Sequence, residues 1–125
     1  YKSLKRKIKK YNQKITLFGY THSIKDLMAA CNIIITKPGG VTVAEVLAKK
    51  IPMIIVKPIP GQEANNTAFL TEEGAALKVD KPERIYQVVE DLLEHPVKLD
   101  EMSQAASRIG KPNASMDIAK LLLTL

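Results

Sequence analysis

The sequence predicts an α/β fold, in which helices flank a parallel sheet. Four candidate strands, at residues 14–18, 33–36, 53–56 and 75–79, alternate along the chain with stretches of helical periodicity. Three of the four are continuous apolar or β-branched runs, which are typical of strands buried on both faces of a parallel sheet. We therefore expect half or more of a doubly wound domain, in which ligands bind beyond the carboxyl ends of the strands.

Helices are expected between the strands and after the last of them. Ser23 is a candidate N-cap for the first of these helices, and Gly74 is suited to end the third. Pro82 can occupy the first turn of the helix that follows the last strand, with an apolar face that extends to Leu93. The other expected helices cover residues 23–30, 42–49, 63–73, 98–108 and 115–123.

A basic amphipathic helix is predicted at the N-terminus. Tyr1, Leu4, Ile8 and Tyr11 recur at helical spacing and form one apolar stripe among lysines. The first fourteen residues carry seven basic side chains and no acid, while the remainder has 12 basic and 13 acidic groups. Either the stripe packs on the domain and the lysines are solvated, or the helix contacts an anionic lipid surface, at about 1 kcal/mol per basic residue.

Length and composition indicate a single domain. With 125 residues, 46% of them hydrophobic, the chain can build one core. The single cysteine, Cys31, excludes an internal disulfide, and no apolar stretch has the length of a signal or membrane-spanning segment, so a cytoplasmic setting is expected. Because the chain begins at Tyr1 and its first methionine is Met28, we expect it to be part of a longer protein.

The stretch Lys-Pro-Gly-Gly-Val-Thr-Val-Ala-Glu, residues 37–45, is the most informative one. It joins the end of an expected strand to the start of a helix, and its adjacent glycines let backbone approach a ligand closely. Free N–H groups at a helix start carry a partial positive charge that suits phosphate. The turn alone matches neither the dinucleotide-binding fingerprint nor the P-loop pattern, so by itself it indicates only an anion site.

Residues 34–45 and 57–66 together resemble the donor-binding half of processive diacylglycerol glycosyltransferases and monogalactosyldiacylglycerol synthases. These enzymes are relatives of the N-acetylglucosaminyl transferase that makes lipid II. The resemblance implies a partial Rossmann-like sheet, with residues 1–125 as the truncated C-terminal, UDP-sugar-binding domain of a GT-B type glycosyltransferase. It implies an N-terminal acceptor domain outside this chain, which supplies the catalytic base for an inverting transfer of a hexose to a lipid acceptor.

The resemblance also implies roles for the matching residues. Glu45 would accept hydrogen bonds from the ribose hydroxyls, and main-chain groups at Tyr20 would meet the uracil edge. The diphosphate would be bound by backbone groups and one hydroxyl at Gly39, Gly40, Val41 and Thr42. The phosphate and sugar oxygens would be surrounded by Gly61, Gln62, Glu63, Asn65 and Asn66.

Two of these assignments have structural alternatives. Thr42 and Glu45 also fit the capping-box pattern, in which the pair stabilises the helix start by about 1 kcal/mol. Glu63 could be an ordinary first-turn acid, which the helix dipole favours. The sequence contains no Asp-x-Asp pair and no ligand-spaced histidines, so no metal and no cofactor are predicted, and helix N-termini would stabilise the leaving UDP.

The partners expected from this interpretation are a UDP-sugar, a lipid acceptor and an anionic membrane surface, with no nucleic acid. We expect the protein to be cytoplasmic, peripheral at the inner face of the cell membrane, and the isolated chain to bind the nucleotide without transferring sugar. An incomplete sheet would expose an edge and favour self-association. The alternatives are a sugar-nucleotide epimerase of the same architecture and a non-enzymatic basic module that binds membrane or nucleic acid.

Overall fold

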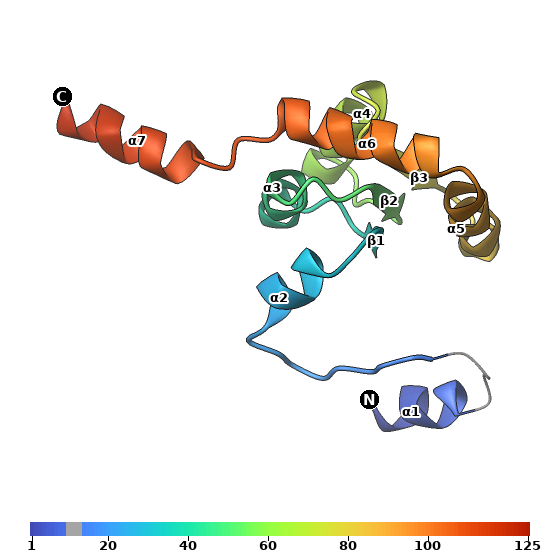
Figure 1. Ribbon diagram of the computed structural model, residues 1–125. Coiled ribbons are helices and arrows are strands. Elements are labelled where there is room, and N and C mark those ends of the chain that lie inside the picture. Colours follow the sequence, from blue (N-terminus) through green and yellow to red (C-terminus); the bar gives the residue numbers. More distant parts are fainter. Residues whose placement is uncertain (10–13) are drawn as a thin grey trace.

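The computed structural model describes residues 1–9 and 14–125 as a layered α/β domain with a helix projecting at each end (Figure 1). Its strands are short, and helices account for most of the described residues. In order, the elements are α1 (Lys2–Ile8), α2 (Ile24–Ala29), β1 (Ile34–Thr36), α3 (Gly40–Ala48), β2 (Met53–Val56), α4 (Gln62–Glu72), β3 (Ala76–Val79), the 3-10 helix η1 (Pro82–Arg84), α5 (Ile85–Glu94), α6 (Pro96–Ile109) and α7 (Ala114–Leu123).

The described residues form a three-stranded parallel sheet in the order β1-β2-β3. Thr36 is in register with Ile55 on one side of β2, and Val56 is in register with Val79 on the other. The carboxyl ends of the three strands therefore lie together at one edge of the sheet. This arrangement confirms the expected fold class, with β2 as the central strand.

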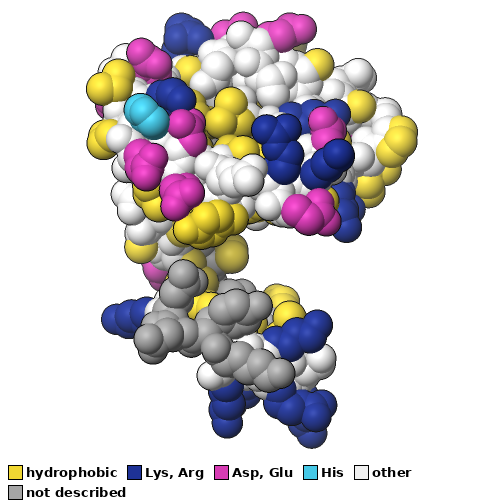
Figure 2. All heavy atoms as spheres, turned by 90° about the vertical axis from the view of Figure 1, so that its right-hand side faces the viewer, with side chains coloured by type: hydrophobic (Ala, Val, Ile, Leu, Met, Phe, Trp, Pro, Cys, Tyr) yellow, Lys and Arg dark blue, Asp and Glu magenta, His cyan; other side chains and the backbone are white. Residues whose placement is uncertain are grey.

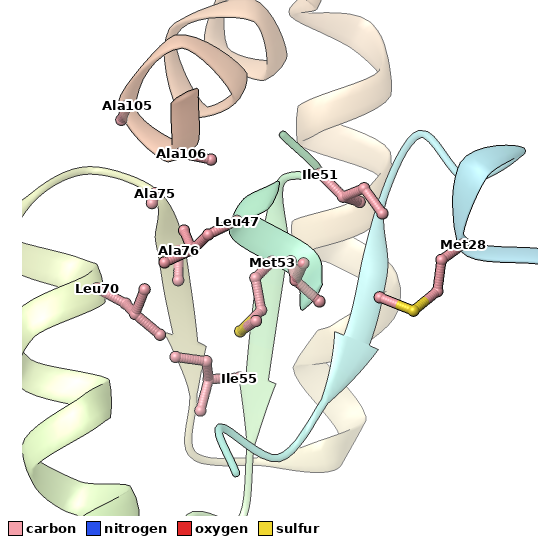
Figure 3. Close-up of a cluster of buried hydrophobic side chains, with 11 residues drawn as sticks. Met28, Leu47, Ile51, Met53, Ile55, Leu70, Ala75, Ala76, Ala105 and Ala106 are labelled. Atoms are coloured by element: carbon pink, nitrogen blue, oxygen red, sulfur yellow. The ribbon is translucent and has the colours of Figure 1, made fainter. Parts of the chain in front are cut away.

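Both faces of the sheet are covered, because successive residues of β2 point to opposite sides. Met53 and Ile55 join a buried cluster that includes side chains of α3, α4 and α6 (Figure 3). Ile54 points to the other face and packs with Leu92 of α5 and Met102 of α6. This burial on both sides explains why the strand reads as an uninterrupted apolar run.

The prediction of a fourth strand at residues 14–18 is wrong. This segment is extended but lies outside the sheet, and in Figure 1 it runs between α1 and α2, away from the strands. Ile15 and Phe18 leave 44% and 52% of their surface exposed. An extended segment becomes a strand only when a neighbour satisfies its backbone N–H and C=O groups.

The helices agree with the sequence to within a few residues. Pro82 begins η1, which leads into α5, and Pro96 stands at the start of α6. Gly74 follows α4 with a φ of 79°, a conformation that favours glycine, and the Ala75 N–H then donates to the Leu70 carbonyl at 2.9 Å. Two helices, α3 at Gly40 and α6 at Pro96, begin two residues before their expected starts.

The two terminal helices, α1 and α7, bury none of their residues. Tyr1 and Leu4 of the predicted stripe are 63% and 53% exposed, whereas Ile8 is half-buried, so the first two members of the stripe are not packed into the core. Tyr11, the last member of the stripe, lies outside the described residues. Among the described helices, none combines the length and the apolar character needed to cross a membrane.

Candidate functional site

The glycine turn, residues 37–40, connects the carboxyl end of β1 to α3. Gly39 is the N-cap residue of α3, with extended backbone (φ −63°, ψ 143°), and its carbonyl accepts a hydrogen bond from the Val43 N–H at 2.8 Å. The N–H groups of Gly40, Val41 and Thr42 occupy the first turn, where a helix has no internal acceptors for them. Val41 is 76% exposed and the first turn carries no acid, so this positive helix end is open to an anion.

A second helix N-terminus follows β2. The proline-rich loop, residues 57–61, ends at Gly61, whose φ of 99° and ψ of −124° are accessible to glycine and strained for other residues. Glu63, in the first turn of α4, accepts a hydrogen bond from the Ile59 N–H at 2.6 Å through its Oε2 atom. This carboxylate therefore holds the loop against the helix that follows it.

The two helix N-termini are linked to each other. The Asn66 Nδ2 group of α4 donates a 2.8 Å hydrogen bond to the carbonyl of Pro38, 28 residues away in the glycine turn. Gln62 lies over Gly40, since a Cβ atom on that glycine would stand 3.5 Å from the Gln62 Nε2 atom. Two sets of free N–H groups are thus brought to the same edge of the sheet by parallel strands that end side by side.

Thr42 and Glu45 do not form the capping box that their spacing allows. The N-cap residue is Gly39, no side chain caps the helix start, and Thr42 falls in the third helical position. The Thr42 hydroxyl oxygen lies 3.9 Å from where a Cβ atom of Gly39 would stand, so it sits beside the turn. Glu45 lies one turn further along the helix and is half-buried. Its carboxylate makes no capping hydrogen bond.

The structure brings most of the predicted site residues to the ends of β1 and β2, but Tyr20 stands apart from them. Tyr20 lies on the extended segment before α2, is 91% exposed, and packs edge-on against His22 with ring centroids 5.0 Å apart. The residues gathered at the strand ends are Gly39, Gly40, Val41, Thr42, Glu45, Gly61, Gln62, Glu63, Asn65 and Asn66. Within the described part of the chain, no group of three or more His, Cys, Asp or Glu side chains could hold a metal ion.

The sequence did not indicate that two of these residues make side-chain hydrogen bonds within the protein. It assigned Glu63 and Asn66 to the ligand, whereas each has a side-chain bond within the protein, to Ile59 and to Pro38. The sequence feature that could have indicated the Glu63 bond is the proline-rich loop. Proline has no backbone N–H group, so this loop cannot form regular backbone hydrogen bonds, and a side chain of the next helix can accept from one of its remaining N–H groups. Both side chains keep a second polar atom that can face a ligand.

Comparison with known proteins gives a consistent picture. Residues 1–122 match the family described as "Glycosyltransferase family 28 C-terminal domain". The chain is 38% identical over 124 residues to a processive diacylglycerol beta-glucosyltransferase of Staphylococcus saprophyticus, covering 99% of this chain and 32% of that protein. It is also 38% identical over 105 residues to the protein of the same name from Bacillus licheniformis, covering 84% of this chain and 27% of that protein.

A solved structure has the same fold. The crystal structure of MurG from Acinetobacter baumannii aligns with a TM-score of 0.76 and 24% identity, covering 92% of this chain and 36% of that one. Together with the family match, this likeness confirms the fold class expected from the sequence, the C-terminal domain of a GT-B type glycosyltransferase. The chain spans about a third of the length of the first of these relatives.

Proposed function

Because the chain belongs to the family of glycosyltransferase family 28 C-terminal domains, we propose that it is the UDP-sugar-binding part of an inverting hexosyltransferase. The acceptor of the complete enzyme is a lipid of the diacylglycerol type. Relatives named as diacylglycerol glucosyltransferases support this reaction over sugar-nucleotide epimerisation by the same architecture.

The observation that carries the proposal is the pairing of the two helix N-termini. The Asn66 to Pro38 hydrogen bond and the contact of Gln62 with Gly40 hold the starts of α3 and α4 beside each other. A diphosphate carries negative charge on two neighbouring groups, and two adjacent helix starts offer it N–H donors and positive dipole ends. The diphosphate is bound by Gly39, Gly40, Val41 and the hydroxyl of Thr42.

The remaining parts of the donor have separate contacts in this proposal. Glu45 accepts hydrogen bonds from the two ribose hydroxyls, and the main chain near Tyr20 meets the uracil edge. The half-buried Glu45 has no capping role that would compete with this one. The hexose and the phosphate oxygens are contacted from the start of α4 by Gly61, Gln62, Glu63, Asn65 and Asn66.

This chain's contribution to the proposed reaction is to stabilise the negative charge on the leaving UDP. As an acceptor hydroxyl attacks the anomeric carbon, the bond to the diphosphate oxygen breaks and negative charge grows on UDP. Preorganised N–H groups at the two helix starts favour that charge without reorganisation, which is the largest contribution in many enzymes. The base that takes the acceptor proton belongs to a domain outside this chain, so the chain alone binds the donor without transferring sugar.

The setting proposed for the complete protein is cytoplasmic, peripheral at the inner face of the cell membrane, where a lipid acceptor is available. The exposed basic helix α1, with Tyr1 and Leu4 outward, supports contact with an anionic membrane surface.

Calorimetry of the chain with UDP, UDP-glucose, UDP-galactose, UDP-N-acetylglucosamine and GDP tests the donor assignment. We expect binding of UDP and at least one UDP-sugar, and weaker binding of GDP. Equal responses to UDP and GDP, or no response to any nucleotide, would remove the donor role and leave only the fold.

A further inference from the structure

A second cationic site lies at the carboxyl end of β3, separate from the glycine turn. Here the chain forms a cavity of about 270 Å³, lined by Lys78, Val79, Asp80, Lys81, Arg84 and Val88. Val79 is buried and Val88 half-buried, so the hollow has an apolar base beneath charged side chains. We call it the β3-end pocket.

The charges of the β3-end pocket are unbalanced. Three cations line it with one carboxylate, and that carboxylate, Asp80, pairs with Lys78 at 2.9 Å. Neither Lys81 nor Arg84 has an ion-pair partner among the described residues, and the neighbouring Glu83 does not line the hollow. Like charges held close together repel, so this arrangement is relieved when an anion enters.

The three cations converge because the chain turns between them. Lys78 is on β3, Lys81 precedes η1, and Arg84 is the last residue of η1, so strand, turn and 3-10 helix each supply one. Figure 2 shows Lys and Arg side chains together with acidic ones on the upper part of the face that it presents. A guanidinium with adjacent ammonium groups is the donor set that proteins use for phosphate, and Arg can bind it with two parallel hydrogen bonds.

We propose that the β3-end pocket binds a phosphate monoester, whose dianion matches the two cations left without a carboxylate. Val56 of β2 is in register with Val79, so the pocket opens at the same edge of the sheet as the proposed donor site, at the next strand end. The phosphate comes either from a soluble ester or from a lipid headgroup with a terminal phosphate. This site is distinct from the diphosphate contacts at Gly39 to Thr42 and does not depend on them.

Nuclear magnetic resonance of the isotopically labelled chain tests the proposal. Inorganic phosphate, titrated at constant ionic strength, should shift the amide resonances of residues 79–88. The double variant Lys81→Gln, Arg84→Gln should weaken this response by about tenfold or more, because it removes charge-assisted hydrogen bonds. Lys111→Gln, which removes a positive charge outside the pocket, should leave the response unchanged.

Flotation with vesicles identifies the source of the phosphate. Vesicles of phosphatidylcholine containing phosphatidic acid, which has a terminal phosphate, are compared with vesicles containing phosphatidylglycerol. Preferential binding to phosphatidic acid that the double variant loses indicates a lipid headgroup. A phosphate response at residues 79–88 without such preference indicates a soluble ester.

The outcomes that would overturn the site are equally specific. Shifts confined to residues 39–42, shifts that sodium chloride reproduces, or a response to phosphate that the double variant retains would each remove it. An amide spectrum of the double variant that matches that of the unmodified chain outside residues 79–88 serves as the folding control. Loss of the phosphate response with this spectrum intact supports the pocket, and failure of UDP binding in the unmodified chain would count only against the proposed function.

Discussion

Gly61 shows how one residue sets the start of a helix. Its φ of 99° and ψ of −124° are strained for any residue with a Cβ atom, although nothing stands within 4 Å of where that atom would be. The constraint is therefore the backbone and not the available space. Gly39 is the opposite case, because its φ of −63° is ordinary and a Cβ atom would make a normal contact with Thr42.

Gly61→Ala should accordingly destabilise the fold by about 1–3 kcal/mol, the usual cost of a strained backbone. Gly39→Ala is the matched control and should change the free energy of unfolding by less than about 1 kcal/mol. Urea denaturation of the two variants measures both values. Equal losses would show that the conformation at position 61 is not what requires glycine.

Glu45 keeps its proposed ribose role without a structural competitor, since the capping alternative is gone. We predict that Glu45→Ala weakens UDP binding by about tenfold, the effect of losing a charge-assisted hydrogen bond. In the unmodified chain, 2′-deoxy-UDP should bind more weakly than UDP, and the variant should no longer distinguish the two ligands. Equal affinities of the unmodified chain for both would remove the ribose role.

At the scale of elements, the link between α4 and the glycine turn depends on Asn66. Pro38 is buried, and its carbonyl accepts from the Asn66 side chain. Asn66→Ala should lower the free energy of unfolding by about 1 kcal/mol, the net value of such a bond. Asn65→Ala, at an exposed position on the same helix, should cost less than about 0.5 kcal/mol. A smaller loss for Asn66 than for Asn65 in urea denaturation would contradict the link.

The junction between α5 and α6 has a pH dependence of known sign. A hydrogen bond from Lys98, at 2.8 Å, lowers the pKa of Asp91 below its ordinary value of 3.8, and the charge of Lys98 and His95 acts in the same direction. A carboxylate with a lowered pKa stabilises the fold above that ordinary value, and the contribution is lost as the pH falls through the lowered pKa.

Asp91→Asn should therefore lose less stability than the unmodified chain when the pH drops from 5 toward 2. Melting temperatures measured across this range check the difference, which should shrink in high salt because the pair is exposed. Glu72→Gln removes another exposed acid and should leave the pH profile closer to that of the unmodified chain. Parallel profiles for Asp91→Asn and the unmodified chain would contradict the assignment.

At the scale of the whole molecule, the chain exposes surfaces that other protein usually covers. Within the described ranges 1–9 and 14–125, β1 has a neighbour on one side only, and α7 presents Leu121, Leu122 and Leu123 with at least 63% of each exposed. An open strand edge and a projecting apolar helix both favour association. We predict a sedimentation coefficient that rises with concentration, and a single monomeric species at all concentrations would count against this.

In the proposed mechanism, the base that takes the acceptor proton belongs to a domain outside this chain. The purified chain should bind UDP-sugar without releasing UDP in the presence of diacylglycerol, because charge stabilisation at the donor alone cannot remove the acceptor proton. Detectable turnover by the chain would show that the base lies within residues 1–125.

The sequence by itself determined the features that depend on local physics. Apolar runs predicted β1 to β3, Pro82 and Gly74 predicted helix boundaries, and the adjacent glycines predicted the turn that starts α3. These signals are local because torsional preferences and side-chain periodicity act within a few residues. Apart from Tyr20, the residues named from the resemblance lie after two of the strands, and their contacts with a donor stay predictions.

Only the tertiary structure decided what depends on neighbours distant in sequence. Residues 14–18 have strand-like composition but pair with no strand in the described part of the chain, and Asn66 donates to the Pro38 carbonyl 28 residues away. The cations at the end of β3 meet in one pocket only because strand, turn and 3-10 helix fold around it. Strand pairing, hydrogen bonds between distant residues and the clustering of charged side chains all depend on groups that the fold brings together in space. No pattern along the chain therefore reveals them.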